Sequence, residues 1–129
     1  MNSPTPIRTR FEHAEPILAV RDMAVSLAYY RDVLGFRAAP WGSDDFTLMT
    51  RDGANIYLCH GGQGTHGTWV WVGVEDVAAL HAEYVAAGAR IRKGPVNRPW
   101  AYEMQVEDPN GHVLRFGSEP RTDLPVNAK

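Results

Sequence analysis

Apolar residues along the first third of the chain follow two different spacings. Residues 15 to 20 (EPILAV) form a short apolar run, which predicts a strand, and residues 23 to 35 carry apolar side chains at helical spacing, which predicts a helix. Asp22 stands where a helix N-cap is needed, and Gly35 stands where a left-handed residue ends a helix. The pattern therefore indicates a strand followed by a helix.

Two further strand-like runs, residues 46 to 50 and 55 to 60, flank the tripeptide Arg51-Asp52-Gly53. An Asp-Gly pair allows the positive backbone angles of a tight turn between antiparallel strands. These residues therefore predict a β-hairpin.

Residues 61 to 67 (GGQGTHG) hold four glycines and separate this first part of the chain from a second part. We interpret the segment as a flexible linker, because it has few side chains to pack and a large backbone entropy to lose. After it, residues 69 to 74 (WVWVGV) predict a strand, Asp76 predicts a second helix cap, and Gly88 predicts the end of a second helix.

The two parts repeat each other at a nearly constant offset. Asp76 follows Asp22 by 54 residues, and later in the repeat Gly111 follows Gly53 by 58 residues. The chain is therefore predicted to be a tandem duplication of a βαβββ unit, which is an α+β fold. The expected organisation is an N-terminal extension (1–13), a single domain (14–118) with half-repeats of about 14–60 and 68–118, and a C-terminal surface tail (119–129).

Alternation along the strands assigns side chains to the two faces of each sheet. Successive side chains of a strand point to opposite faces, and the helix of each unit must cover one face with apolar contacts. The helix-facing set is Leu18, Val20, Val70, Val72, Val74, Met104, Val106, Leu114 and Phe116. The opposite, uncovered set is Glu15, Ile17, Ala19, Tyr57, Trp69, Trp71, Gly73, Glu103, Gln105, Val113 and Arg115. Indole, phenol, carboxylate and guanidinium groups together are typical of a binding surface rather than of a core.

Composition and charge narrow the class of protein. The hydrophobic content of 44% favours a folded domain over a disordered chain. The formal net charge of −2 leaves no positive excess for a phosphate backbone, so nucleic acid is not an expected partner. Cys59 is the only cysteine, which excludes an intrachain disulfide and favours a cytoplasmic location. The sequence shows no signal peptide and no run of about 18 apolar residues, so no membrane association is expected.

Three segments carry a resemblance to a known family: ILAVRDMAVSLAYYRDVLGF (17–36), TWVWVGVEDVAALHAEYVAAGA (68–89) and PWAYEMQVEDPNGHVLRF (99–116). Over residues 14 to 118 the chain resembles the glyoxalase/bleomycin-resistance/extradiol-dioxygenase superfamily, also called vicinal oxygen chelate. The WVWV strand and the last segment are most similar to bleomycin-resistance proteins. The resemblance implies an open cup-shaped sheet, a homodimer and, for that branch, binding of an antibiotic.

Enzymes of this superfamily hold a divalent ion at pseudo-symmetric strand positions, which here read Glu15, Tyr57, Trp69 and Arg115. Only Glu15 is an ordinary metal ligand, because an indole has no free lone pair and a guanidinium does not deprotonate. A divalent ion needs several imidazole or carboxylate donors around it. The resemblance, read with these residues, therefore implies a protein without a metal and without a cofactor.

The alternative is a metal-dependent enzyme of the glyoxalase or dioxygenase class, with an irregular site that combines Glu15 with His13 and His60. The remaining histidines are expected at the surface: His66, His81 and His112. No other catalytic motif accompanies them, because Cys59 on a strand is typical of a small buried hydrophobe and residues 61 to 64 lack the Lys-Ser/Thr of a phosphate loop.

Aromatic residues are the strongest indication of a ligand. The predicted ligand-binding residues are Glu15, Phe46, Tyr57, Trp69, Trp71, Trp100, Glu103 and Arg115, within an aromatic cluster that also includes Trp41 and Tyr102. A planar ligand would stack on the uncovered rings, with about 1 kcal/mol from each ring. Glu15, Glu103 and the pair Asp44-Asp45 would complement a positive ligand. Arg115 opposes a cationic antibiotic, so it pairs either with Glu15 or with an anionic group on the ligand.

The leading hypothesis is a metal-free, homodimeric protein that binds an aromatic antibiotic of the bleomycin type without changing it covalently. Besides the enzyme alternative, a third possibility is a member of the fold whose uncovered faces serve dimerisation alone.

Overall fold

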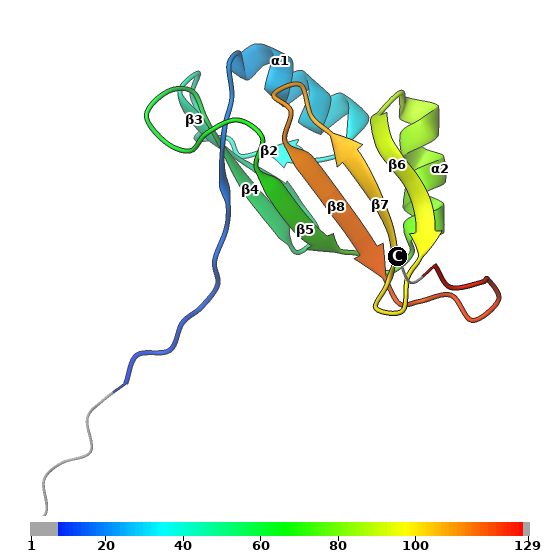
Figure 1. The fold of residues 1–129 in the computed structure, drawn as a ribbon. Coiled ribbons are helices and arrows are strands. Elements are labelled where there is room, and N and C mark those ends of the chain that lie inside the picture. Colours follow the sequence, from blue (N-terminus) through cyan, green and yellow to red (C-terminus); the bar gives the residue numbers. More distant parts are fainter. Residues whose placement is uncertain (1–7, 128–129) are drawn as a thin grey trace, which may run out of the picture.

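The computed structural model describes residues 8–127 and divides them between two four-stranded sheets (Figure 1). The strand order is β1-β4-β3-β2 in the first sheet and β5-β8-β7-β6 in the second. The elements are β1 (Ile17–Ala19), α1 (Met23–Ala28), η1 (Tyr29–Val33), β2 (Arg37–Ala38), β3 (Phe46–Arg51), β4 (Ala54–Cys59), β5 (Trp69–Gly73), α2 (Val77–Ala87), β6 (Arg90–Asn97), β7 (Tyr102–Glu107) and β8 (Val113–Ser118). β1 pairs in parallel with β4, and β5 pairs in parallel with β8. The other strand pairs are antiparallel. The predicted α+β fold of tandem βαβββ units is confirmed.

Both helices begin at the predicted aspartates. The Oδ1 atoms of Asp22 and Asp76 each accept a hydrogen bond from the backbone amide three residues later, at 3.2 and 3.1 Å. Gly35 and Gly88 both have φ of 79°, the left-handed conformation that ends a helix. Among residues 8–127 no helix has the length and apolar run needed to cross a membrane.

The first helix differs from the regular helix expected, because its second half widens into the π-helical segment η1. The amide of Leu34 donates to the carbonyl of Tyr29 at 3.0 Å, a bond across five residues. This segment places two consecutive tyrosines against the second unit. The hydroxyl of Tyr29 donates to the carbonyl of Glu107 at 2.6 Å, and that of Tyr30 donates to Asp108 at 3.0 Å. Burial, and then the Asp108 carboxylate, raise the pKa of Tyr30 well above its ordinary value, so the hydroxyl remains a donor.

One hydrophobic core joins the two units. Its buried members come from both sheets and from the helices: Leu18, Val20, Met23, Tyr30, Leu34, Phe36, Met49, Ile56, Leu58, Val77, Leu80, Tyr84, Met104, Val106, Leu114 and Phe116. The predicted helix-facing residues of β5, Val70 and Val72, together with Val74 just after it, are partly buried against this core. The assignment of the helix-facing side by strand alternation is therefore confirmed.

His112 also joins the two units, and its predicted surface position is wrong because the side chain is fully buried. Its Nδ1 accepts from the amide of Thr68 at 3.0 Å, so its Nε2 carries the hydrogen and donates to the carbonyl of Ala19 at 2.6 Å. Next to it, the Asn110 side chain donates to the hydroxyl of Ser26 at 2.9 Å. The turn between β7 and β8 is thereby bonded to the first unit.

The segment after β8 returns to the end of β6, where Asn97 holds it. The Asn97 side chain donates to the carbonyls of Arg121 and Leu124 at 2.8 and 3.2 Å and accepts from the Arg121 amide at 2.8 Å. The Asn97 carbonyl accepts from the amide of Asn127 at 2.7 Å. These bonds bring the described end of the chain beside the turn between β6 and β7.

Candidate functional site

The uncovered face of the first sheet carries three aromatic side chains in contact. Phe46 on β3 and Tyr57 on β4 are stacked with ring centroids 5.1 Å apart and an interplanar angle of 17°. Trp41, in the loop before β3, stacks on Phe46 at 6.4 Å and is 60% exposed. We call these three residues the first-sheet patch. They offer a flat aromatic surface with no charge of its own.

The uncovered face of the second sheet carries Trp69 and Trp71 on β5, and each ring has an arginine over it. The guanidinium carbon of Arg92 lies 5.0 Å from the centroid of the Trp69 ring, and that of Arg115 lies 5.3 Å from the Trp71 ring. The Trp71 indole also fills the space above Gly117, where a Cβ atom would lie only 2.2 Å from the ring. The two indoles are therefore bound to groups of their own chain.

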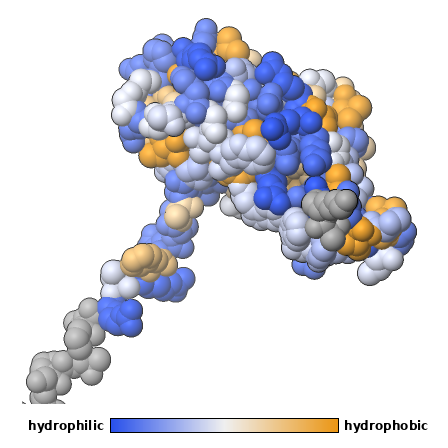
Figure 2. All heavy atoms as spheres, in the orientation of Figure 1, coloured by the Kyte–Doolittle hydropathy of each residue, from blue (hydrophilic) through white to orange (hydrophobic). Residues whose placement is uncertain are grey.

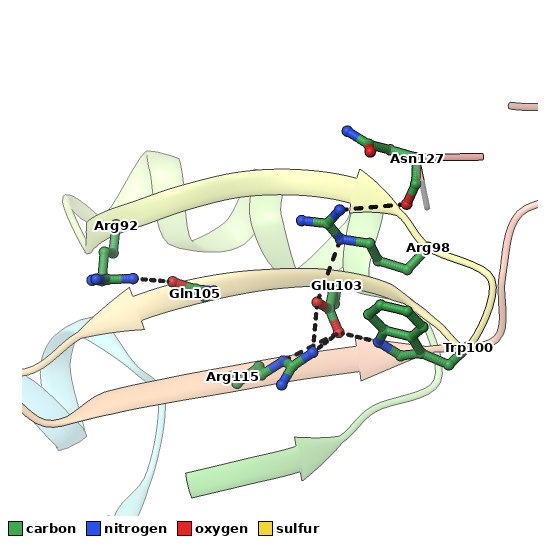
Figure 3. Close-up of polar contacts among 7 residues, drawn as sticks. All are labelled: Arg92, Arg98, Trp100, Glu103, Gln105, Arg115 and Asn127. Atoms are coloured by element: carbon green, nitrogen blue, oxygen red, sulfur yellow. Dashed lines mark hydrogen bonds and ion pairs between the residues drawn. The ribbon is translucent and has the colours of Figure 1, made fainter. Parts of the chain in front are cut away.

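Glu103 lies at the centre of this face and is almost fully buried (Figure 3). Its carboxylate accepts from Nε and Nη2 of Arg115, at distances between 2.9 and 3.2 Å, and from the indole nitrogen of Trp100 at 3.1 Å. The Nε of Arg98 lies 3.8 Å from the same carboxylate. The charge of Glu103 is thus compensated within the chain, and its expected contact with a positive ligand stays a prediction. Arg115 pairs with Glu103 and not with Glu15.

Arg92 and Arg98 were not among the residues that the sequence singled out. Arg92 comes from an irregular part of β6, where the register shifts, and it also donates to the side chain of Gln105. Arg98 lies in the turn after β6, beside Trp100. The sequence does contain a signal for Arg98. It stands two residues before Trp100, a predicted ligand-binding residue, in the run Asn-Arg-Pro-Trp.

We call the second set of residues the second-sheet patch; it consists of Trp69, Trp71, Arg92, Arg98, Trp100, Glu103 and Arg115. In the view of Figure 1, α2 lies behind the second sheet, and Figure 2 shows hydrophilic residues gathered over β7 and β8 on the face turned to the viewer. Within residues 8–127 no ring pair joins the first-sheet patch to the second-sheet patch. Strand alternation had grouped Tyr57, Trp69, Trp71, Glu103 and Arg115 in one uncovered set, whereas one chain presents them on two separate surfaces.

The four positions at which the superfamily's enzymes hold a metal do not form a metal site in this chain. Tyr57 belongs to the first-sheet patch, while Trp69 and Arg115 belong to the second. Glu15 contacts the imidazole of His13 at 2.9 Å. An indole and a guanidinium cannot donate a lone pair, so these residues do not fit a divalent ion.

The irregular metal site is not assembled either. His13 lies against Glu15, whereas His60 lies 3.6 Å from Asp45. In the part of the chain from 8 to 127, no group of three histidine, cysteine, aspartate or glutamate side chains is placed to hold a metal ion. Glu15 and Asp45, both expected near a positive ligand, therefore each have a histidine beside them.

A groove of about 1380 Å³ lies between the two units, bordered by β4, β5 and α2. Its lining carboxylates are Glu15, Asp52, Glu75, Asp76, Glu83 and Glu119, and Trp71 and Trp100 border it from the second sheet. Arg51 crosses the groove and binds Glu83 through bonds of 2.6 and 2.9 Å. The hydrogen bond from Arg51 lowers the pKa of Glu83, and burial raises the pKa of Tyr84 beside it to about 12. The groove thus carries an excess of carboxylates, whereas the second-sheet patch carries an excess of arginines.

Two joined βαβββ units, each with one face covered by a helix and one face carrying exposed aromatic side chains, define the class of fold. The chain belongs to the Glyoxalase/Bleomycin resistance protein/Dioxygenase superfamily, whose family model matches residues 10–116. None of the curated proteins matches the sequence significantly.

Solved structures with this fold include a bleomycin-binding protein and a bleomycin resistance determinant. The bleomycin-binding protein from bleomycin-producing Streptomyces verticillus, solved with copper(II)-bleomycin, is 25% identical, with a TM-score of 0.74 over 88% of this chain and 100% of that chain. The bleomycin resistance determinant encoded on transposon Tn5 is 20% identical, with a TM-score of 0.73 over 84% and 98%. TioX from Micromonospora sp. ML1 is 24% identical, with a TM-score of 0.73 over 84% and 99%. These likenesses support a bleomycin-resistance-like fold.

Proposed function

We propose that this protein binds an aromatic antibiotic, or a similar planar small molecule, and sequesters it without covalent change. The observation that carries the proposal is the exposure of all four tryptophans on or beside the uncovered faces. Trp41, Trp69, Trp71 and Trp100 are each between 50% and 60% exposed. Large exposed apolar side chains that gather on a surface, as Trp69, Trp71 and Trp100 do in the second-sheet patch, are typical of a binding site.

The proposal includes a homodimer in which each patch would form half of a closed site. The first-sheet patch is aromatic and uncharged, and the nearby side chain of Asp45 is 84% exposed. The second-sheet patch carries three arginines. A second copy related by a twofold axis could bring the first-sheet patch of one protomer opposite the second-sheet patch of its partner. The ligand would then lie between rings from both protomers.

The alternatives remain the metal-dependent enzyme and a face that serves dimerisation alone. The donor chemistry at Tyr57, Trp69 and Arg115 favours binding without a divalent ion over the enzyme. The cation-π and ion-pair contacts that fix the second-sheet patch support a preorganised site for a ligand.

Native mass spectrometry of freshly purified protein tests the dimer, the metal and the ligand together. We expect a dimer at micromolar concentration, with no stoichiometric divalent metal. Tryptophan emission should then change in a saturable way on titration with bleomycin or with planar aromatic compounds. The variant Phe11→Ala is a control and should give the same change in emission, because Phe11 is 92% exposed in the chain before β1 and lies outside both patches. A monomer without any aromatic binding, or about one metal per chain, contradicts the proposal.

A further inference from the structure

The second-sheet patch holds more positive than negative charge. One carboxylate, that of Glu103, faces the guanidinium groups of both Arg98 and Arg115. Arg92 adds a third cation, and its Nε lies 3.6 Å from a carboxylate of Glu107. Because the whole chain has a formal net charge of −2, this positive charge is a local property of the patch.

Arg98 is the least compensated of these cations. It is 8% exposed, and its Nη1 donates to the carbonyl of Asn127 over a long 3.4 Å. Among the described residues 8–127, its Nε is the buried side-chain nitrogen without a hydrogen-bond acceptor. A buried guanidinium is destabilising unless charge and hydrogen bonds compensate it. A further negative group beside Arg98 would complete the charge compensation that Glu103, at 3.8 Å, provides only in part.

Arg115 offers the accessible end of this cation pair. Its Nε and Nη2 donate to Glu103, whereas no residue from 8 to 127 accepts a bond from its Nη1. The side chain is 35% exposed, so this edge of the guanidinium can be reached from solvent. Planar guanidinium edges match the oxygen atoms of carboxylate, sulfonate and phosphate groups.

Trp100 supplies an aromatic surface beside the two arginines. Its indole nitrogen donates to Glu103, which fixes the ring next to Arg115 (Figure 3). Unlike Trp69 and Trp71, its ring has no cation stacked on it among residues 8–127. Trp100 as a residue is 55% exposed, which leaves it accessible to a planar ligand.

We infer that the ligand is a planar aromatic anion, whose ring stacks on Trp100 and whose negative group binds Arg115 and Arg98. This inference rests on the proposed function and assigns the charge of the ligand. A cation at the same place would meet three arginines, two of which already cover the other indoles.

Three naphthalenes with the same ring and different charge test this inference: 2-naphthoate, 2-naphthalenemethanol and 2-naphthylmethylammonium. Their dissociation constants for the full chain are measured by calorimetry at low ionic strength. We expect the anion to bind about tenfold more tightly than the alcohol, as a charge-assisted hydrogen bond allows, and the cation to bind most weakly. Added salt should reduce the preference for the anion.

Two variants locate the preference. Arg115→Gln should bind all three probes with similar affinity, and Arg98→Gln should reduce the preference in the same direction. Arg31→Gln is the matched control, because the exposed Arg31 pairs with Asp32 outside both patches, and it should keep the tenfold ratio. Melting temperatures confirm that each variant is folded, and if Arg98→Gln is not, the partly exposed Arg115 decides alone.

The outcomes separate this inference from the proposed function. Equal binding of the three probes, or tightest binding of the cation, overturns the inference and leaves the proposed function in place. An anion preference that survives in Arg115→Gln also overturns it. Failure of all three probes to bind overturns both.

Discussion

The two sheets have the same topology and place different chemistry at equivalent positions. In the first sheet, Phe46 and Tyr57 lie diagonally across β3 and β4 and their rings stack. In the second sheet, Glu103 and Arg115 occupy the equivalent diagonal across β7 and β8 and form an ion pair. The register is the same in both hairpins, with Cys59 in the first at the place of Gly117 in the second. The comparison teaches that the repeated fold determines the direction of each side chain, whereas the residue type at that position differs between the two units.

A second pair of positions differs in the same way. In the first sheet, Ile17 on β1 is paired with Tyr57 on β4, as Trp71 on β5 is paired with Arg115 on β8. At the equivalent place of the second sheet, Trp71 spreads over Gly117. The first sheet therefore carries a partly exposed aliphatic side chain at this place, Ile17 at 37% exposure, where the second sheet carries an indole that lies over the neighbouring strand.

The largest effect should come from removing the carboxylate at the centre of the second-sheet patch. Glu103→Ala leaves Arg98 and Arg115 without their common anion, and we expect it to lower the free energy of unfolding by about 3 to 5 kcal/mol, since one partner of a buried ion pair is lost. Urea unfolding measures this. Asp45→Ala, next to the first-sheet patch, is the control and should leave the stability unchanged because its carboxylate is exposed. Similar stabilities for the two variants would refute the difference between the two faces.

A smaller loss of stability is expected when a side chain is added at Gly117, under the Trp71 ring. Gly117→Ala forces the Trp71 ring away from β8, which should cost about 1 to 3 kcal/mol and change the tryptophan emission. Gly73→Ala is a matched control, because Gly73 pairs with Gly117 and no atom lies within 4 Å of its added Cβ. If both variants have the same stability and emission, the Trp71 ring does not lie over Gly117 in solution.

Binding should then show whether both faces contact the ligand. Trp100→Ala in the second-sheet patch and Tyr57→Ala in the first should each weaken the binding of a planar aromatic ligand by about 1 to 3 kcal/mol, as expected when a stacked ring is lost. Calorimetry of each variant, with its melting temperature, separates binding from folding. A loss of affinity in Trp100→Ala alone would show that the first-sheet patch has another task, such as the dimer contact.

The last prediction is that a chelator leaves the melting temperature unchanged. The superfamily's metal positions divide between the two faces, and the residues there do not fit a divalent ion, so EDTA should leave the melting temperature unchanged. A bound metal at a hundredfold excess over its Kd would contribute about 2.7 kcal/mol, a shift that scanning fluorimetry detects readily. A clear fall in melting temperature with EDTA would favour the metal-dependent alternative.

Periodicity predicted the elements and the helix-facing side well, because burial imposes a period of two on strands and a helical spacing on helices. The caps Asp22 and Asp76 and the ends at Gly35 and Gly88 followed from local backbone chemistry. His112 was misjudged, because its position after a turn gave no sign that Thr68 and Ala19 would bond both ring nitrogens. Contacts between residues far apart leave no local pattern.

The site was predicted by face and not by pairing. Alternation placed Glu103 and Arg115 on the same side, but nothing in the spacing said that they would bond each other. The long side chains of Arg92 and Arg98 extend to other strands. Their guanidinium groups therefore lie beside Trp69 and Glu103, away from their own backbone positions. Charge compensation inside the patch is therefore visible only in three dimensions.

The bonds between the first unit and the turn at residues 108 to 112 also bear on how the chain folds as it is made. They connect Tyr30, Ser26 and Ala19 to partners 78, 84 and 93 residues later in the sequence. During synthesis the first unit therefore emerges with these polar groups unpaired and its core open. Closing so long a loop is slow, and the chain is expected to complete its structure only after nearly all of it has left the ribosome. Until then, its apolar strands are exposed and prone to aggregation.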